Sequence, residues 1–171
     1  YIIVGQSLGS YNEYLKNLKK DDAFGGIFIT EAEALQLYGA NTLLIIADTH
    51  SSDIVESQKL LELIKNKVLI DHHRKGENYI SDTVLSYHEP FASSTCEMVT
   101  EIIQYMDDNP ALSIKEAQAL YAGIAIDTKN FTVKTGVRTF DAASYLRRIG
   151  VDIAAVKKMF QSNLDEYVKR A

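Results

Sequence analysis

Short apolar runs alternate with helical patterns in the first half of this 171-residue chain, and this alternation is the strongest constraint on its fold. Ile2–Val4, Leu43–Ala47 and Val68–Ile70 are short and rich in β-branched residues or leucine, which is typical of parallel strands buried on both faces. Helical patterns separate these runs, at residues 11–20, 30–38 and 57–66. The alternation predicts an α/β fold with a mainly parallel sheet flanked by helices.

The second half of the chain, from residue 90 onward, has mostly helical patterns. Ser94 and Ser113 each stand three residues before a glutamate, which is the spacing of a capping box at a helix N-terminus. We expect Thr139 to cap the next helix and Gly150 to end it. The expected helices of this half are residues 96–106, 114–126, 140–149 and 153–161.

One domain accounts for most of the chain, since ~100–200 residues is the usual size of a domain and 46% of the residues are apolar. We assign residues 1–161 to this domain and expect the more polar residues 162–171 to begin a linker helix. The first residue is Tyr1 and lies at the start of an expected strand. We therefore expect the chain to be a piece of a longer protein.

Charge and composition exclude several classes of function. A formal charge of −5 disfavours a general surface for duplex nucleic acid, which needs excess positive charge. The single cysteine, Cys96, excludes an intrachain disulfide and a multi-cysteine zinc site. The apolar runs are far shorter than the ~20 residues that span a bilayer, so we expect this chain to be soluble and to make no membrane contact.

Carboxylates and imidazoles directly follow three of the apolar runs. Asp48 follows residues 43–47, Asp71 and His72 follow residues 68–70, and Asp127 follows residues 122–126. Each acid alone fits a turn or a helix cap equally well, but the carboxyl ends of parallel strands meet at one edge of a sheet. Mixed carboxylate and imidazole ligands suit Mn²⁺, Zn²⁺ or Fe, and a pair of such ions can catalyse phosphoester hydrolysis.

A family resemblance is carried by five strings of the sequence: Ile46–His50, Ile70–Arg74, Glu89–Thr95, Gly123–Phe131 and Thr135–Arg147. The Asp-His-His triplet within the second string is typical of the DHH phosphoesterase superfamily. Taken together, the five strings resemble the DHH domain of membrane-anchored cyclic di-AMP phosphodiesterases, which also carry a PAS domain and a degenerate GGDEF domain. The resemblance extends over nearly the whole chain, from Ile2 to about Gln161.

The resemblance implies a Mn²⁺-dependent hydrolase that opens cyclic di-AMP to linear pApA. Asp48 would bridge two Mn²⁺ ions, His72 would bind one of them, and Asp127 would complete the site. His73 would lie beside the scissile phosphate as a catalytic residue. Asp71 would orient an imidazole without binding a metal itself.

Substrate and partner contacts are also expected from the resemblance and from the residues themselves. Arg74 follows the metal string, and Arg138 with Thr139 stands at the start of a helix, so we expect these three residues to bind phosphate groups. The expected partners are the cyclic dinucleotide and a C-terminal DHH-associated domain that this chain lacks. A homodimer stays open, and the parent protein is expected at the cytoplasmic side of the membrane.

One family motif is missing from this sequence. The superfamily opens with a strand followed by His-x-x-x-Asp-x-Asp, which supplies three further metal ligands, and no such string occurs here. The three ligands that are present make up half of the expected set. We therefore expect the chain by itself to be inactive, and we expect an exposed strand edge where the first strand would pair.

Two other interpretations stay open at this point: an oligoribonuclease that also hydrolyses 3′-phosphoadenosine 5′-phosphate, and a non-catalytic nucleotide-sensing module. Three further residues invite a functional interpretation and have a simpler one. We expect His50 to lie beside the metal site or at the surface, His88 to belong to a loop or strand, and Cys96 to be a small buried apolar side chain.

Overall fold

Two parallel sheets and a layer of helices form the fold in the computed structural model, which describes residues 1–4, 12–106 and 112–158. A two-stranded sheet pairs β1 (Ile2–Ile3) with β2 (Phe28–Ile29). A three-stranded sheet has the order β3-β4-β5, and its strands are β3 (Leu43–Ala47), β4 (Asn66–Asp71) and β5 (Leu85–His88). All strand pairs are parallel, which confirms the predicted α/β class.

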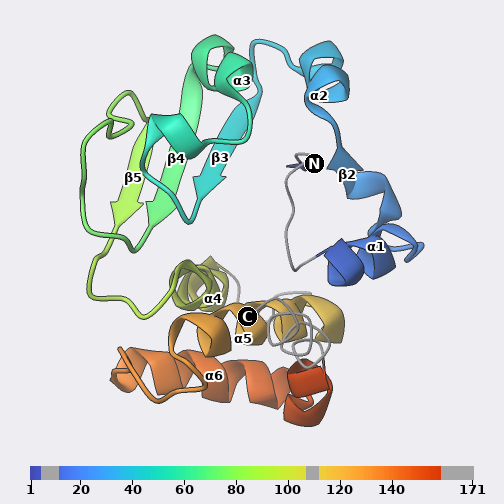
Figure 1. Cartoon of the computed structure of the whole chain (residues 1–171), viewed down its shortest axis with the longest axis vertical. Helices are drawn as coiled ribbons and strands as arrows, with labels where there is room; N and C mark the ends of the chain where they lie inside the picture. The colour runs from blue at the N-terminus through green and yellow to red at the C-terminus, as the bar shows by residue number, and fades with distance from the viewer. Residues whose placement is uncertain (5–11, 107–111, 159–171) are drawn as a thin grey trace, which may run out of the picture.

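The helices connect and cover these strands. They are α1 (Asn12–Lys19), α2 (Glu31–Leu37), α3 (Gln58–Leu63), α4 (Thr95–Met106), α5 (Ile114–Asp127) and α6 (Val137–Ile149), with short 3₁₀ turns at Gly25–Ile27 and Ser52–Ile54. Residues 153–158 are also helical. Figure 1 shows the carboxyl ends of β3, β4 and β5 pointing toward α4, whereas α3 lies near their amino ends.

Local signals place most of the helix ends. Ser113 forms the predicted capping box of α5, and Thr30 forms another at the start of α2. Gly150 ends α6 with a φ of 118°, a left-handed conformation that glycine adopts without steric cost. The expectation for Thr139 is wrong in one respect. The N-cap of α6 is Gly136, and Thr139 stands one turn inside the helix, where its hydroxyl accepts a hydrogen bond from the Gly136 N–H.

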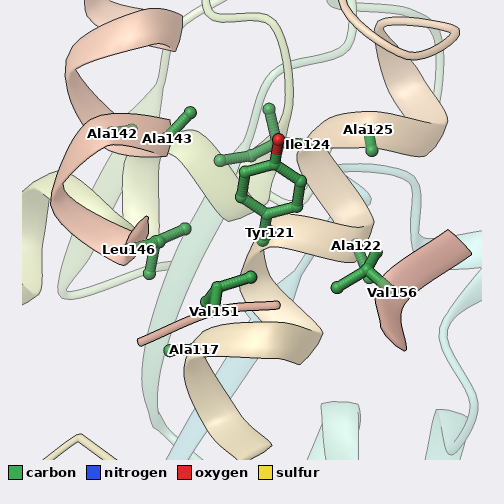
Figure 2. Packing of buried hydrophobic residues seen from close by; sticks show 10 residues of the cluster. All are labelled: Ala117, Tyr121, Ala122, Ile124, Ala125, Ala142, Ala143, Leu146, Val151 and Val156. Carbon is green, nitrogen blue, oxygen red and sulfur yellow. The ribbon is translucent and has the colours of Figure 1, made fainter. Parts of the chain in front are cut away.

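The largest buried cluster lies among α5, α6 and residues 151–156 (Figure 2). Tyr121 and Ile124 of α5 face Leu146 of α6 and Val151. Leu146 and Val151 are almost completely buried. Two smaller clusters lie beside the strands, one around Ile46 and Leu69, the other around Leu60. The helical layer therefore has its own core, and it provides a firm support for residues that α5 presents to the sheet edge.

Several element bounds differ from expectation because strand pairing overrides local pattern. The predicted helix over residues 57–66 ends at Leu63, since Asn66 already pairs with Leu43 in the sheet. The sequence pattern also missed β2 and β5, which are too short or too polar to be recognised alone. The expected linker, residues 162–171, lies outside the described residues.

An open three-stranded sheet has two edge strands, and the expectation that a missing first strand leaves one of them exposed stays a prediction. β3 is at one end of the strand order, and its Leu43 and Ile45 side chains are 51% and 60% exposed. Apolar side chains on an unpaired edge are unfavourable in water unless another segment covers them. Among the described residues, no helix is long and apolar enough to cross a bilayer.

Candidate metal centre

Asp48 lies just beyond the carboxyl end of β3 in an unusual backbone conformation. Its φ is 64°, in the left-handed region that aspartate tolerates better than most residues. The Asp48 N–H donates to the carbonyl oxygen of Ile70 on β4 over 3.0 Å, which fixes this conformation. The Asp48 side chain remains 59% exposed, so its carboxylate is open to a ligand from solution.

His72 stands beside this carboxylate and next to a second one. Its Nε2 atom lies 3.5 Å from Asp48 Oδ1 and 3.7 Å from Asp127 Oδ2. The other ring nitrogen, Nδ1, lies 3.4 Å from the carbonyl oxygen of Ala92, so a proton on Nδ1 can be donated to that oxygen. This leaves the Nε2 lone pair directed toward the two acids, which is the usual arrangement of a metal-binding histidine.

Asp127 comes from the last turn of α5 rather than from a strand end. Burial and then the negative charge of Asp48 raise the pKa of the Asp127 carboxyl, while the imidazoles of His72 and His73 oppose this shift. The carboxyl end of a helix also carries partial negative charge, which disfavours a carboxylate there. A cation bound between the acids would relieve all of these repulsions at once.

Asp71 lies behind the exposed site and is completely buried. Its Oδ1 atom is 2.7 Å from His73 Nδ1, and its Oδ2 atom is 2.5 Å from His50 Nδ1. Burial by itself would raise the pKa of the Asp71 carboxyl, but the hydrogen bonds from His73 and His50 outweigh burial and hold the pKa below its usual range. Asp71 is therefore a carboxylate that holds two imidazoles.

His73 is the more exposed of the two tandem histidines, with a side chain 53% exposed. One ligand atom of His73 lies within 4.8 Å of one ligand atom each of Asp48 and His72, so these three residues form a candidate metal-binding group. The backbone of His73 is held as well, since His88 Nε2 lies 2.5 Å from its carbonyl oxygen. The structure thus brings together the predicted residues Asp48, Asp71, His72, His73 and Asp127.

The three expected phosphate ligands are placed differently. Arg74 is exposed and follows the histidines directly. Arg138 donates to both carboxylate oxygens of Glu101, over 2.7 and 2.5 Å, and also to the hydroxyl of Tyr87. Thr139 is 1% exposed and accepts a hydrogen bond within its own helix. Phosphate binding by these three residues stays a prediction.

Sequence reasoning missed two histidine contacts in this region. His50 is buried against Asp71, and His88 at the end of β5 contacts the backbone of His73. The position of His50 two residues after Asp48 is the one sequence signal that links it to the site. Its partner stands 21 residues away on the neighbouring strand, so pattern alone does not reveal the contact.

Relatives of known name match this chain over most of its length. It is 45% identical to the cyclic-di-AMP phosphodiesterase GdpP of Bacillus subtilis over 95% of the chain and 25% of that protein. It is 42% identical to the cyclic-di-AMP phosphodiesterase PdeA of Listeria monocytogenes over 84% of the chain and 22% of that protein. The chain therefore spans about a quarter of the length of these relatives.

Solved structures share the fold at low sequence identity. An exopolyphosphatase-related protein from Bacteroides fragilis matches 94% of this chain and 46% of that one, with a TM-score of 0.70 and 20% identity. A putative family II inorganic pyrophosphatase from Methanococcus jannaschii matches 96% of this chain and 50% of that one, with a TM-score of 0.60 and 18% identity. The family model for the DHH family, N-terminal domain, matches residues 5–124, a range that holds Asp48 and the Asp71–His73 triplet and stops just before Asp127. The chain belongs to the DHH family, as its sequence motifs predicted.

Proposed function

We propose that this chain is the metal-binding part of a phosphodiesterase that hydrolyses cyclic di-AMP to linear pApA with Mn²⁺. The observation that carries the proposal is the approach of Asp48 and Asp127, from a strand end and a helix end, to the same nitrogen of His72. The substrate class is supported by the relatives named as cyclic-di-AMP phosphodiesterases, which are 42% to 47% identical to this chain.

The donor set fits a divalent ion such as Mn²⁺. Two carboxylates and one neutral imidazole nitrogen are ligands that Mn²⁺ accepts, and a cation would offset the burial and the negative charge of Asp48 that raise the pKa of Asp127. When bound, such ions lower the pKa of a bound water and stabilise the charge of a phosphoryl group under attack. We propose two such ions, which Asp48, His72 and Asp127 would hold together with further ligands.

The remaining roles belong to the side chains around this centre. His73, held on its Nδ1 side by Asp71, is proposed to act on the scissile phosphate through its other nitrogen. Arg74 is proposed to contribute positive charge beside it. Arg138 can bind a phosphate group only if it gives up hydrogen bonds to Glu101, so its proposed role includes a rearrangement of this ion pair.

The proposed enzyme is longer than this chain. Three ligands do not hold two ions firmly, so further ligands are proposed to come from a His-x-x-x-Asp-x-Asp segment whose strand pairs beside the exposed edge of β3. A C-terminal DHH-associated domain is proposed to contact the bases. The proposal also places the longer protein at the cytoplasmic side of the membrane.

A direct test compares this chain with a longer protein that carries it. We expect Mn²⁺-dependent hydrolysis of cyclic di-AMP by the longer protein and none by the chain alone. Asp127→Ala should abolish the activity, whereas the matched control Glu62→Gln should not, because Glu62 is an exposed acid on α3 at the opposite end of the strands. Full activity of Asp127→Ala would refute the proposed centre.

The same assay separates the two other interpretations. Faster hydrolysis of short oligoribonucleotides and 3′-phosphoadenosine 5′-phosphate than of cyclic di-AMP would indicate the oligoribonuclease branch of the superfamily. Binding of a cyclic dinucleotide without turnover, at any Mn²⁺ concentration, would indicate a nucleotide-sensing module. Either result would overturn the proposed substrate while leaving the family assignment intact.

A further inference from the structure

A buried chain of hydrogen bonds runs behind His73 and ends on the backbone of a loop. The N–H of Gly76 lies 3.0 Å from His50 Nε2, His50 Nδ1 lies 2.5 Å from Asp71 Oδ2, and Asp71 Oδ1 lies 2.7 Å from His73 Nδ1. His50 is 8% exposed and Asp71 is completely buried, so the bond between these two side chains is shielded from water. The four groups form one continuous path from loop to exposed imidazole.

The donor and the acceptor of every hydrogen bond in this path can be assigned, starting from the backbone N–H of Gly76. A backbone N–H can only donate, so His50 Nε2 must accept and therefore carries no proton. The proton of the His50 ring is then on Nδ1 and is donated to Asp71 Oδ2. The second oxygen of this carboxylate can only accept as well, so the proton at the His73 contact is on Nδ1 of His73.

The consequence for His73 is a defined tautomer. With the proton on Nδ1, the Nε2 nitrogen of the neutral ring carries no proton and keeps a free lone pair. The ring cannot turn over without breaking the contact with Asp71, and the His73 carbonyl oxygen is held by His88. The same logic, a buried carboxylate that fixes one imidazole nitrogen so that the other can act, underlies catalytic triads of hydrolases.

An alternative for this region is a second metal site, since ligand atoms of His50, Asp71 and His88 lie within 4.8 Å of one another. The hydrogen bonds argue against it. Both nitrogens of His50 are already engaged, and Nε2 of His88 lies 2.5 Å from the His73 carbonyl oxygen but 3.9 Å from Asp71 Oδ2. A metal here would have to displace a buried N–H proton, whereas a hydrogen-bonded network needs no change.

We propose that His50 is a positioning residue: the Gly76 N–H holds the His50 proton on Nδ1, and His50, by donating to Asp71, holds the carboxylate that fixes His73 as the Nδ1–H tautomer. The inference rests on the proposed function for the role of His73 in hydrolysis. The tautomer itself is a property of the chain without metal or substrate, so it can be measured independently of any activity.

The test is nuclear magnetic resonance of the histidine side-chain nitrogens in the 171-residue chain. The sample contains a chelator and is kept at about pH 8, above the ordinary imidazole pKa of about 6.5. The chain has only four histidines, so single His→Gln variants assign the signals. We expect His50 and His73 both as the Nδ1–H tautomer, although unconstrained neutral imidazole favours Nε2–H. A proton on Nε2 of either ring overturns the proposal, and the tautomers themselves are read from the wild-type chain.

Variants of His50 then test its positioning role. His50→Asn keeps an N–H donor near the position of Nδ1, and we expect His73 to keep its tautomer in this variant. His50→Leu leaves Asp71 Oδ2 without its donor, so the carboxylate is no longer held in place and can turn away from His73, and we expect His73 signals to shift toward a mixture of tautomers in the folded chain. Unchanged His73 signals in folded His50→Leu overturn the role of His50. Gly76→Ala keeps the backbone N–H, and its added methyl group meets only an ordinary contact at 3.5 Å, so it is the matched control.

Failure of this inference and failure of the proposed function give different results. If the longer protein does not hydrolyse cyclic di-AMP but both rings carry Nδ1–H, the function is wrong and the positioning stands. If hydrolysis occurs and His73 carries Nε2–H, the positioning is wrong and the function stands.

Discussion

Arg138 of α6 holds the carboxylate of Glu101 on α4 with two nitrogens: Nε lies 2.7 Å from Oε1, and Nη2 lies 2.5 Å from Oε2. The pair joins two helices of the helical layer, and a further bond from Arg138 to the Tyr87 hydroxyl over 3.0 Å joins both to β5. Glu101 raises the pKa of the Arg138 guanidinium, so the arginine stays charged at any ordinary pH. This contact connects the helical layer with the strand that carries His88.

Loss of this ion pair is expected to destabilise the chain modestly. Two parallel hydrogen bonds make the pair stronger than a single surface contact, although the Arg138 side chain is 45% exposed. We expect Glu101→Ala to lower the free energy of unfolding by about 1 kcal/mol in urea denaturation. The control is Lys59→Ala, which removes a single 3.5 Å contact to Glu31 from a lysine that is 69% exposed, and should cost less than about 0.5 kcal/mol. Equal effects of the two variants would contradict the expectation.

Cys96 is expected to react slowly with alkylating reagents in the folded chain. Burial, followed by the negative charges of Asp48 and Asp127, raises the pKa of its thiol to about 12 from an ordinary value of 9.0. Since the thiolate is the reactive form, the native rate at pH 8 should be on the order of 1,000-fold below that of the unfolded chain. Iodoacetamide labelling followed by mass spectrometry measures this directly, because the chain has one cysteine. Similar rates with and without urea would show that the thiol is not shielded.

Gly123 allows α5 to pack closely against α4. A Cβ atom at this position would lie 2.2 Å from Cys96 Sγ and 3.1 Å from Cys96 Cβ, distances that force the helices apart. We expect Gly123→Ala to destabilise the chain by about 1–3 kcal/mol. Cys96→Ala should restore part of this loss in the double variant, because it removes the closer of the two contacts.

A matched control for this substitution is Gly136→Ala at the N-cap of α6, where an added Cβ meets no atom within 4 Å. It should cost only about 0.5 kcal/mol, because alanine is a poorer N-cap than glycine but meets no steric clash. If the losses of stability caused by Gly123→Ala and Cys96→Ala simply add in the double variant, as measured by thermal unfolding, then the two residues are not in contact as described.

Residues with a positive φ predict that glycine stabilises the chain and that alanine destabilises it at such positions. Lys129, Asn130 and Phe131 have φ values of 47°, 56° and 63°, a left-handed turn of three residues that side chains disfavour. Lys129→Gly should raise the free energy of unfolding by up to about 1 kcal/mol. Gly150→Ala, at a φ of 118°, should lower it by about 1 kcal/mol, although the added methyl group has room. Urea denaturation of the two variants checks both signs, and a stabilised Gly150→Ala would contradict the argument.

Asp71 is expected to contribute stability that depends on pH. Its pKa in the folded chain lies below the ordinary value of 3.8, so its contribution is fully present above about pH 4 and is lost as the pH falls through the folded pKa. The groups that face it are His50, His73 and His88. Asp71→Asn places an amide N–H₂ against ring N–H groups, and it should cost about 2–4 kcal/mol at pH 7.

The measurement is urea denaturation of the wild-type chain and Asp71→Asn at several pH values. The difference between them should stay constant from pH 7 to about pH 4 and shrink only below that. A difference that does not shrink at all below about pH 3 would contradict this dependence on pH. The exposed acid Glu62 provides a control, since Glu62→Gln should show no such difference.

Local sequence determined much of this fold. The apolar runs at residues 43–47 and 68–70 are parallel strands, as their leucine and β-branched residues indicate, although β3 exposes Leu43 and Ile45 and is therefore not buried on both faces as predicted. The capping boxes at Thr30 and Ser113 and the left-handed Gly150 act within one helical turn, so their signals are complete in the sequence. The grouping of Asp48, His72 and Asp127 also followed from motifs at element ends.

Only the tertiary structure decided which side chains meet across the chain. β5, with the sequence Leu-Ser-Tyr-His, is a strand because β4 offers it a parallel partner, not because of its own pattern. His50 meets Asp71 over 21 residues, and Arg138 meets Glu101 over 37. Such contacts depend on how strands pair and helices pack. A short window of sequence contains the propensity of a segment but not the neighbour that will face it.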